Sequence, residues 1–565
     1  MLGMYLRETK RKNGDGSIAR YYQLAENNWD KQKGCAVARV IYNFGRADEL
    51  DGEKLKRLAK SILRIFSGEA ALAAEPDVRI IDAWPYGGVF VLEQLWRELE
   101  IHKMLGSRKP LERALFAMTA NRALLPYSKL YCHEQWLKED VFLPDGQDLK
   151  LHQFYRAMDF LLVNQTELEN AVYFKMADLM NADVDLIFYD TTNVHFEVDE
   201  EDEAEVTGPD GVKRKPLRKR GWAKNKRYDA PLVSVGLAVT REGLPVRSWV
   251  FPGNTADVAT VERVKTDLKG WRLGRCVFVG DAGMNSQDNR RKLSLGGGKY
   301  ILASKMRAGD EVTKEVLTRA GRYHAVAGNL EVKEVIVGNG ERRQRYVVCH
   351  NPEEEKRQRA HREKLLAELE VELETLQPRD SGHTKRVCGL VTSARFGKYL
   401  RQLKTGELQI DRAAVADAER YDGKWVITSN DDTLSAEDLG LGYKQLMRVE
   451  ECWRSMKSGL RMRPVYHWAP HRIEAHIKLC VLGLLLERIA EIRVGDTWRN
   501  IVAKLDTIKV IEYVRGETRV RQTTEVHAEV AAMLKKLGVA MPPKLHHVAA
   551  EPVPEKTVPS NTALS

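Results

Sequence analysis

Three isolated acidic residues stand where they could bind metal ions together. Asp190 and Asp281 each follow a nearly continuous apolar run, VDLIFY and CVFVG, which is typical of a buried strand, and Glu450 lies on a predicted helix. The carboxyl ends of neighbouring strands meet at one edge of an open α/β sheet. Three carboxylates at that edge would repel one another unless a divalent cation such as Mg²⁺ shared them. Because two such ions can activate an attacking oxygen and stabilise the leaving one, the pattern predicts metal-dependent chemistry on a phosphodiester.

The stretch from Gly442 to Tyr466 is predicted to present Glu450 on a helix that ends at an Arg-Pro stop. At about 100° per residue, its apolar side chains form one stripe: Leu446, Val449, Trp453, Met456 and Leu460. An adjacent, mostly polar stripe contains Tyr443, Met447, Glu450, Arg454, Lys457 and Arg461. An amphipathic surface helix with ion pairs would show the same pattern. Glu451 is the rival to Glu450, but it lies about 100° round the helix from the polar stripe.

A single aspartate after a strand has a simpler explanation, because helix caps and loop acids also occur there. Both Asp190-Thr191-Thr192 and Asp281-Ala282-Gly283 allow that interpretation. Asp431 and Asp432 follow a predicted strand and are interpreted as loop acids that introduce the next helix. The order of the three candidate acids along the chain nevertheless favours a shared metal site.

The composition restricts the class of protein. The chain of 565 residues contains 90 Lys and Arg against 80 Asp and Glu, and this net charge of +10 suits a polyanionic partner. Its seven cysteines are scattered and form no C-x-x-C pair, which argues against a zinc module or a secreted disulfide framework. No stretch reads as a signal peptide or a membrane span. We therefore expect a cytoplasmic protein without membrane contact.

The elements that must position the acids begin near residue 181, where a helical pattern gives way to strands. Residues 1–50 are predicted to form a small β unit, and 51–180 an all-helical block that is either a DNA-binding domain or a plain bundle. The core is predicted over 181–304 and 421–495. Its strands are expected at 184–190, 231–240, 244–251, 275–281, 299–304 and 424–430.

The remaining segments are expected to surround this core. Residues 305–420 are predicted to interrupt it as a separate subdomain, with a hairpin at 331–350 and a charged helix at 352–377. A helix at 471–492 is apolar enough to pack on the sheet. Residues 496–547 would form a C-terminal region, and 548–565 a disordered tail.

A basic segment, 213–227, contains nine Lys or Arg in fifteen residues, with Trp222 among them, and follows an acidic run at 197–205. The two runs could neutralise each other in a solvated loop. Alternatively, the basic segment could contact DNA phosphates beside the acids, in a salt-sensitive contact that fixes register more than sequence. On that interpretation Lys224, Lys226 and Arg227 bind DNA.

Around the three acids the chain resembles the DDE transposases of bacterial insertion sequences, in the IS-four-like group. The resemblance is carried by IFYDTTNVHFE around Asp190, VFVGDAGMNS around Asp281 and YKQLMRVEECWRSMKSGLRMRPVYH around Glu450. On the last helix of that group Tyr, Arg, Glu and Lys stand at fixed spacing. Tyr443, Glu450 and Lys457 fit this spacing, whereas Leu446 stands at the Arg position. That departure indicates the branch whose helix reads Y-x-x-L-x-x-V-E, and Arg454 could replace the missing phosphate contact.

The resemblance implies an α/β fold with an RNase H-like mixed-sheet core, a β-rich insertion and a preceding helical DNA-end-binding domain. It implies a transposase that cleaves insertion-sequence ends and joins the released 3′-hydroxyl to target DNA. Asp190, Asp281 and Glu450 would bind two Mg²⁺ ions, for which Mn²⁺ can substitute.

The resemblance also implies the contacts of such an enzyme with its DNA. Tyr443 and Lys457 would position or neutralise the phosphate backbone, and Arg454 could add a contact. By their charge alone, Lys457, Arg461 and Arg463 could hold the strand near its scissile phosphate. A homodimer would hold paired terminal inverted repeats of double-stranded DNA. A domesticated DNA-binding protein that no longer cuts, and a nuclease of the same fold, are the alternatives.

Overall fold

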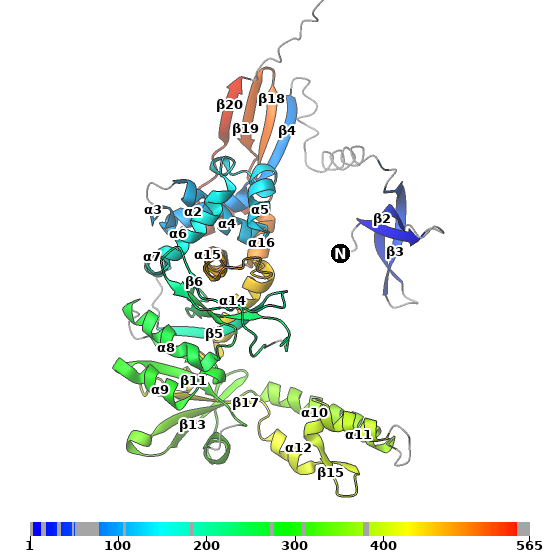
Figure 1. Ribbon diagram of the computed structural model, residues 1–565, viewed down its shortest axis with the longest axis vertical. Coiled ribbons are helices and arrows are strands. Elements are labelled where there is room, and N and C mark those ends of the chain that lie inside the picture. The colour runs from blue at the N-terminus through cyan, green and yellow to red at the C-terminus, as the bar shows by residue number, and fades with distance from the viewer. Residues whose placement is uncertain are drawn as a thin grey trace, which may run out of the picture. The chain divides into compact units, whose positions relative to one another are not determined.

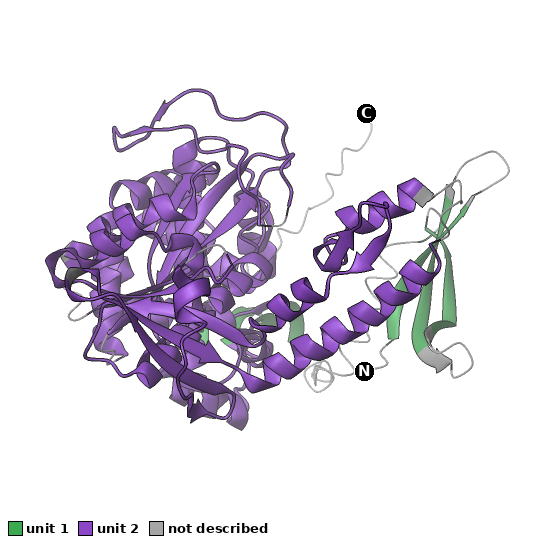
Figure 2. Cartoon of the chain, turned by 90° about the horizontal axis from the view of Figure 1, so that it is seen from below, with its two compact units in different colours: residues 1–83, 511–522, 545–565 green, residues 84–510, 523–544 purple. Residues whose placement is uncertain are grey.

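The computed structural model (Figure 1) describes residues 4–12, 18–30, 35–47, 50, 78–104, 109–180, 185–224, 226–271, 276–307, 311–376 and 383–550. The chain divides into two compact units (Figure 2): unit 1 comprises 1–83, 511–522 and 545–565, and unit 2 comprises 84–510 and 523–544. The three candidate acids all lie in unit 2. None of the helices in the described ranges is long and apolar enough to cross a membrane.

Unit 1 is built mainly from strands. Its N-terminal sheet has the order β1-β2-β3, with β1 at Met4–Lys12, β2 at Ile18–Asp30 and β3 at Cys35–Arg46. A second sheet has the order β20-β19-β18-β4, formed by β4 (Val78–Pro85), β18 (Lys509–Arg515), β19 (Thr518–Thr523) and β20 (Leu545–Ala550).

Two sequence predictions were wrong in these strands. Residues 78–85 form β4 within the block expected to be helical, because β4 pairs with the distant β18. Strand β20 includes the first residues of the expected tail, and the remainder of that tail lies outside the described residues. Residues 13–17 and 31–34 of the predicted β unit, and residues 51–77 of the predicted helical block, also lie outside them.

Unit 2 is organised around a nine-stranded mixed sheet of order β12-β13-β14-β17-β11-β10-β5-β8-β9. Its strands are β5 (Leu186–His195), β8 (Leu232–Val239), β9 (Pro245–Pro252), β10 (Val277–Gly280), β11 (Lys299–Ser304), β12 (His324–Ala327), β13 (Leu330–Val337), β14 (Gln344–His350) and β17 (Lys424–Ser429). β10 runs parallel to β5 and β11, whereas the other neighbouring pairs of this sheet are antiparallel. Every residue of β8 is buried, which explains its continuous apolar sequence. The predicted mixed α/β class is confirmed.

The alternation of side chains along β5 decides which face of the sheet Asp190 occupies. Tyr189 donates a hydrogen bond to Thr260 of α8 (Asp257–Leu268) at 3.0 Å. Successive side chains of a strand point to opposite faces, so Asp190 points away from α8. Helix α14 (Met447–Arg454), which contacts β5 and β8, covers the face that Asp190 occupies.

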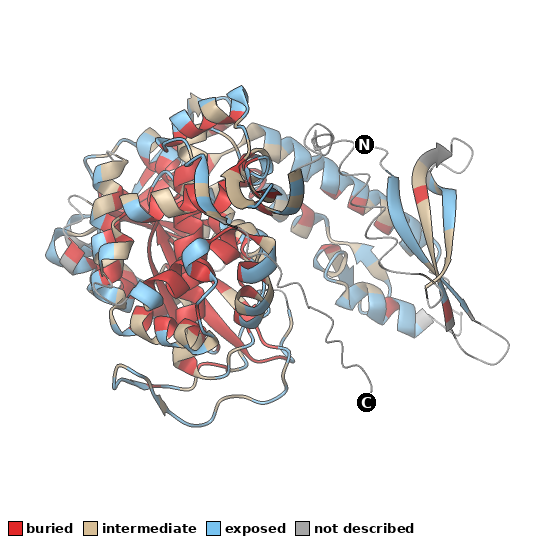
Figure 3. Ribbon diagram, turned by 90° about the horizontal axis from the view of Figure 1, so that it is seen from above, coloured by how far each residue is buried: buried red, intermediate tan, exposed pale blue. Residues whose placement is uncertain are grey.

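A long buried helix, α15 (Pro470–Val494), lies between the sheet and a layer of helices. It packs against β9, α4 (Lys109–Leu124) and α6 (Leu151–Val163). Because α15 is covered on several sides, its apolar residues are not confined to one stripe, and Figure 3 shows the buried interior that results. The predicted packing of residues 471–492 on the sheet is confirmed. The layer also contains α2 (Gly87–Glu98), α3 (Ile101–Met104), α5 (Lys129–Tyr131) and α7 (Gln165–Leu179).

The prediction of a β-rich insertion at 305–420 was wrong in its secondary structure. The β13–β14 hairpin is part of the central sheet, because β14 pairs with β17 along its buried length. The segment that projects from the sheet is mostly helical: α10 (Pro352–Glu374), α11 (His383–Thr392) and α12 (Arg412–Glu419), with a short β15–β16 ladder (Leu400–Gln402 and Leu408–Ile410). Leu369, Tyr399 and Val415 form a small core of its own.

Candidate active site

The register of the parallel strands brings Asp190 and Asp281 together. Tyr189 of β5 is paired with Gly280 of β10, so the next residue on each strand is one of the two aspartates. Asp281 follows the end of β10, as predicted. The prediction that β5 ends at Asp190 was wrong, because the antiparallel partner β8 continues the ladder to His195 after the parallel partner has stopped.

The two aspartates have different surroundings. Asp281 caps the short turn Ala282–Met284, and its side chain accepts a hydrogen bond from the backbone N–H of Ala282 at 2.5 Å. The side chain of Asp190 is 16% exposed, and its carboxylate lies 3.5 Å from the ammonium of Lys224. Burial raises the pKa of Asp190 above its ordinary value, although the charge of Lys224 opposes the change. Asp281 thus caps a turn beside the site, whereas Asp190 is buried next to a lysine.

The stretch predicted to be a single helix is divided, and Glu450 lies on the short helix α14. Helix α13 (Ala436–Lys444) is separated from α14 by a turn, and a π-helical segment, Ser455–Gly459, follows α14. The backbone N–H groups of Leu446 and Val449 bond to carbonyls three residues earlier, which tightens the chain at the turn. The predicted apolar stripe is buried nonetheless, with Leu446 the most exposed of its five members at 8%.

The three candidate acids open into one cavity of about 560 Å³. The residues that line it are Asp190, Thr191, Thr192, Lys224, Asp281, Tyr443, Leu446, Glu450, Trp453, Arg454, Lys457, Ser458 and Arg463. Four cations, Lys224, Arg454, Lys457 and Arg463, thus share a cavity with three acids. Burial lowers the pKa of Lys457, and the nearby charges of Arg463 and Lys224 lower it further. Burial raises the pKa of Tyr443, with Asp281 and Glu450 adding to the effect, so its phenol stays a hydrogen-bond donor.

Several of the acids and cations considered from the sequence, Asp431 and Asp432 among them, do not line this cavity. Glu451 pairs with Arg448 at 3.0 Å on another side of α14. Arg227 pairs with Glu197 at 2.8 Å, and Arg461 stacks over the ring of Tyr127 at 5.8 Å. Lys226 is also absent from the lining. Of the three basic-loop residues proposed to bind DNA, only Lys224 therefore faces the acids.

The acidic and basic runs of the loop neutralise each other in part. Arg218 pairs with Asp202 at 2.5 Å, and Lys219 with Glu201 at 3.7 Å. Lys224 contacts the site instead of the acidic run: its ammonium lies 3.5 Å from the carboxylate of Asp190 and donates to the carbonyl of Thr191 at 2.6 Å. Neutralisation within the loop is thus confirmed for part of it, and a contact between Lys224 and DNA stays a prediction.

The donor atoms of the cavity suit a hard divalent cation. Its acidic ligands are carboxylates, and neither a thiol nor an imidazole is among the lining side chains. Among the described residues, no three acidic, histidine or cysteine side chains stand close enough together to hold an ion as they are. Lys224 supplies the positive charge beside Asp190 in this arrangement.

Sequence reasoning missed Thr191 and Asp257. The hydroxyl of Thr191 donates to the carboxylate of Asp257 at 2.5 Å, and the charge of Asp257 helps to raise the pKa of Asp190. Asp257 is the first residue of α8, where an acidic residue is ordinary because it complements the helix dipole. Its position in the sequence alone did not distinguish it.

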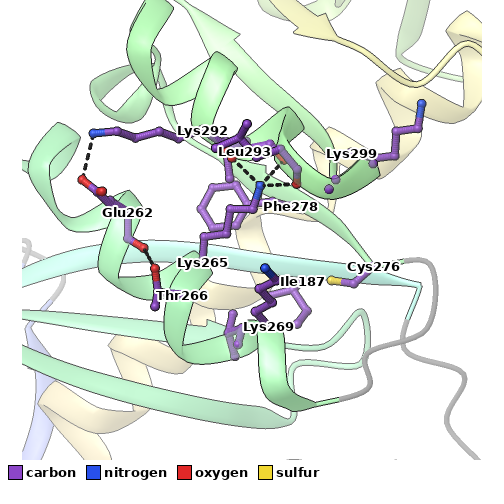
Figure 4. Close-up of a pocket in the computed structure, with 15 residues that line it drawn as sticks. Ile187, Glu262, Lys265, Thr266, Lys269, Cys276, Phe278, Lys292, Leu293 and Lys299 are labelled. Carbon is purple, nitrogen blue, oxygen red and sulfur yellow. Dashed lines mark hydrogen bonds and ion pairs between the residues drawn. The ribbon is translucent and has the colours of Figure 1, made fainter.

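A second cavity, of about 490 Å³, lies at the opposite ends of the parallel strands (Figure 4). Three of its four lysines are engaged. Lys265 donates to the carbonyl of Leu293 at 2.7 Å, and Lys292 pairs with Glu262 at 2.8 Å. Lys299 donates to the carbonyl of Asn430 at 3.1 Å. Glu262 is the single carboxylate in its lining. This cavity therefore lacks the group of acids found at the first.

Comparisons with known proteins identify the family of the chain. A model of the N-terminal domain of IS1634 family transposases matches residues 6–76, and a model of the transposase DDE domain matches residues 194–486, which is more than half of the chain. Asp281 and Glu450 lie inside the second match, and Asp190 lies just before it. No curated protein matches the chain. Among solved structures, the cryo-EM structure of the piggyBac transposase synaptic complex with hairpin DNA is similar at 9% identity and a TM-score of 0.35, covering 74% of this chain and 78% of that one.

Proposed function

The chain belongs to the DDE transposase family and is a DNA transposase, and we propose that Asp190, Asp281 and Glu450 are the acids that bind its catalytic metal ions. The observation that carries this assignment is the single cavity in which the three acids meet four cations. Two Mg²⁺ ions, for which Mn²⁺ can substitute, would supply activation of the attacking oxygen and stabilisation of the leaving oxygen.

The chain's own cations and phenol would hold the DNA backbone at this cavity. Lys224, Lys457, Arg454 and Arg463 face the acids and would neutralise the phosphates on either side of the bond that breaks. Tyr443 would donate a hydrogen bond from its protonated phenol to a phosphate oxygen. These contacts support cleavage at the ends of the insertion sequence, followed by transfer of the 3′-hydroxyl into target DNA.

Several finer features belong to the same proposal. The parallel β5–β10–β11 strands with antiparallel neighbours support an RNase H-like core. The spacing of Tyr443, Leu446, Val449 and Glu450 supports the IS-four-like branch whose helix reads Y-x-x-L-x-x-V-E. The helical layer before β5 would bind the terminal inverted repeats, and a homodimer would hold the two ends together.

Cleavage of the element's own end tests the assignment. Purified protein is incubated with Mg²⁺ and a labelled duplex carrying that end, beside Glu450→Gln and the matched control Glu451→Gln. We expect Glu450→Gln to lower the rate by more than about 100-fold, because even the partners that orient metal ligands are worth about 10–100-fold. Glu451→Gln should cleave like the wild type, since Glu451 pairs with Arg448 outside the cavity.

The other outcomes identify the alternatives. A wild-type protein that binds the duplex without cutting it would be a DNA-binding relic, and cleavage without joining would indicate a nuclease. Loss of cleavage only in Glu451→Gln would show that the assigned acid is wrong.

A further inference from the structure

The backbone that enters the cavity after the π-helical segment is held by buried side chains from two other helices. His476 of α15 donates from Nε2 to the carbonyl of Met462 at 2.9 Å. Arg122 of α4 donates to the carbonyl of Arg461 at 3.2 Å. The two carbonyls that immediately precede Arg463, a lining residue of the cavity, are therefore each fixed by a separate helix.

The orientation of His476 is set by Lys129. The ammonium of Lys129 lies 2.6 Å from Nδ1 of His476. Burial lowers the pKa of Lys129 to about 7, so the charge of its amine does not decide the tautomer. The carbonyl of Met462 can only accept, so the ring proton lies on Nε2 and Nδ1 accepts from the amine of Lys129. The side chains are almost completely buried, with Lys129 7% and His476 2% exposed. Burial lowers the pKa of His476 well below its ordinary value, so the ring is held as a neutral donor.

The turn itself needs these contacts. Arg461 has a φ of 44°, a left-handed conformation that is uncommon for a residue other than glycine. Backbone bonds from Leu460 to Ser455 and from Met462 to Met456, at 2.9 and 2.8 Å, hold one side of the turn. Such a conformation persists where the surroundings determine it, and Arg122 and His476 supply the contacts to its carbonyls.

We propose that Lys129, His476 and Arg122 form a positioning network that sets the place of the Arg463 guanidinium relative to the three acids. None of the three lines the cavity, so they act through the backbone at 461–463 and not on DNA directly. The inference rests on the proposed function, in which Arg463 contacts a phosphate. It connects the helical layer, through α4 and α5, to the phosphate contact in the active site.

A double-mutant cycle on cleavage of the labelled duplex tests the network. We expect His476→Leu to lower kcat about tenfold with KM almost unchanged, because displacement of a group near the chemistry costs rate rather than binding. His476→Gln should restore most of the rate, since its amide nitrogen can still donate to Met462. In the Arg463→Ala background His476→Leu should cost little more, because a residue that acts only through another is not additive with it.

Lys478→Met is the matched control. Lys478 is, like His476, a buried residue of α15. It contacts Glu169 and the carbonyl of Ser248 instead of the turn. Its effect on cleavage should multiply with that of Arg463→Ala. Independent effects of His476→Leu and Arg463→Ala, or a loss in His476→Gln as large as in His476→Leu, would overturn the network. A normal rate in Arg463→Ala would instead refute the phosphate contact in the proposed function.

Limited proteolysis gives a readout that does not depend on cleavage of DNA. Because local opening of the backbone favours proteolysis, we expect trypsin to cut after Arg461 faster in His476→Leu than in the wild type, under conditions where both are folded. Lys478→Met should be cut there at the wild-type rate. Equal rates in His476→Leu and the wild type would show that the contact does not hold the turn.

Discussion

At the scale of single residues, the main feature of the site is the carboxylate of Asp190, whose burial disfavours its charged form. Asp190 is largely buried, and the compensating cation in the structure is Lys224. A buried charge costs free energy unless it is paired. Asp190 is therefore expected to favour the binding of a cation at some cost to the stability of the metal-free protein.

The pH dependence of stability follows from this shift. Because the pKa of Asp190 is raised on folding, the folded chain holds the proton more tightly than the unfolded chain. Its contribution to stability is greatest below the unfolded pKa and is lost as the pH rises through the folded pKa. We expect Asp190→Asn to unfold at a higher temperature than the wild type at neutral pH in EDTA, with a smaller difference below about pH 4.

Calorimetry with and without Mg²⁺ checks this prediction. Adding Mg²⁺ should narrow the difference, because a ligand that binds only the folded wild type raises its stability. Asp185→Asn is the control, since Asp185 is exposed and pairs with Arg241 at 2.8 Å. A wild type more stable than Asp190→Asn in EDTA at neutral pH would contradict the argument.

Asp257 leads to a second prediction at this scale. Its carboxylate accepts from the hydroxyl of Thr191, the residue next to Asp190 on β5. Asp257→Asn should lower the cleavage rate by about 10–100-fold, which is the usual cost of losing a partner that orients a metal ligand. The apparent affinity for Mg²⁺, measured from the Mg²⁺ dependence of cleavage, should weaken as well. Unchanged Mg²⁺ dependence would show that Asp257 acts only on folding.

At the scale of elements, the positions of the core strands could be predicted from the sequence, whereas the pairing of one strand with another could not. The apolar runs that precede Asp190 and Asp281 are buried on both faces, and this gives a strong local signal. The pairing of β14 with β17 joins segments separated by the helical projection. No local pattern reports such a contact. The break between α13 and α14 was likewise invisible, because the apolar stripe continues through it.

Close packing between β5 and β8 gives a prediction for one glycine. A Cβ at Gly236 would lie 2.5 Å from the hydroxyl of Tyr189. Gly236→Ala should therefore displace the Tyr189 ring from Thr260 and destabilise the protein by about 1–3 kcal/mol, as overpacking of a core does. Gly389→Ala on α11 is the control, because a Cβ there would meet no atom within 4 Å apart from the neighbouring residues and the backbone of its own helix. Denaturant unfolding measures both, and equal stabilities would contradict the predicted overlap.

At the scale of the whole molecule, the positively charged side chains differ in whether a nearby acid already neutralises them. Many of the cations in the described part of the chain are neutralised by nearby acids, as Arg218 is by Asp202 and Lys292 by Glu262. The cations of the active-site cavity face acids that metal ions would neutralise. The sequence predicted a polyanionic partner from net charge, but it could not show which cations remain available to phosphates, since that depends on tertiary pairing.

The salt dependence of DNA binding distinguishes cations that contact phosphates from cations that are paired with acids. Each neutralised phosphate contributes about 0.9 to the slope of log K against log salt concentration on duplex DNA. Lys457→Ala should therefore reduce the magnitude of the slope by about one, in a titration of Glu450→Gln protein that cannot cut its duplex. Lys292→Ala is the matched control, because Lys292 pairs with Glu262 at the other cavity. An equal change of slope in the two variants would mean that Lys457 contributes only to the general field of the protein, and the assigned path of the DNA through the cavity would then be wrong.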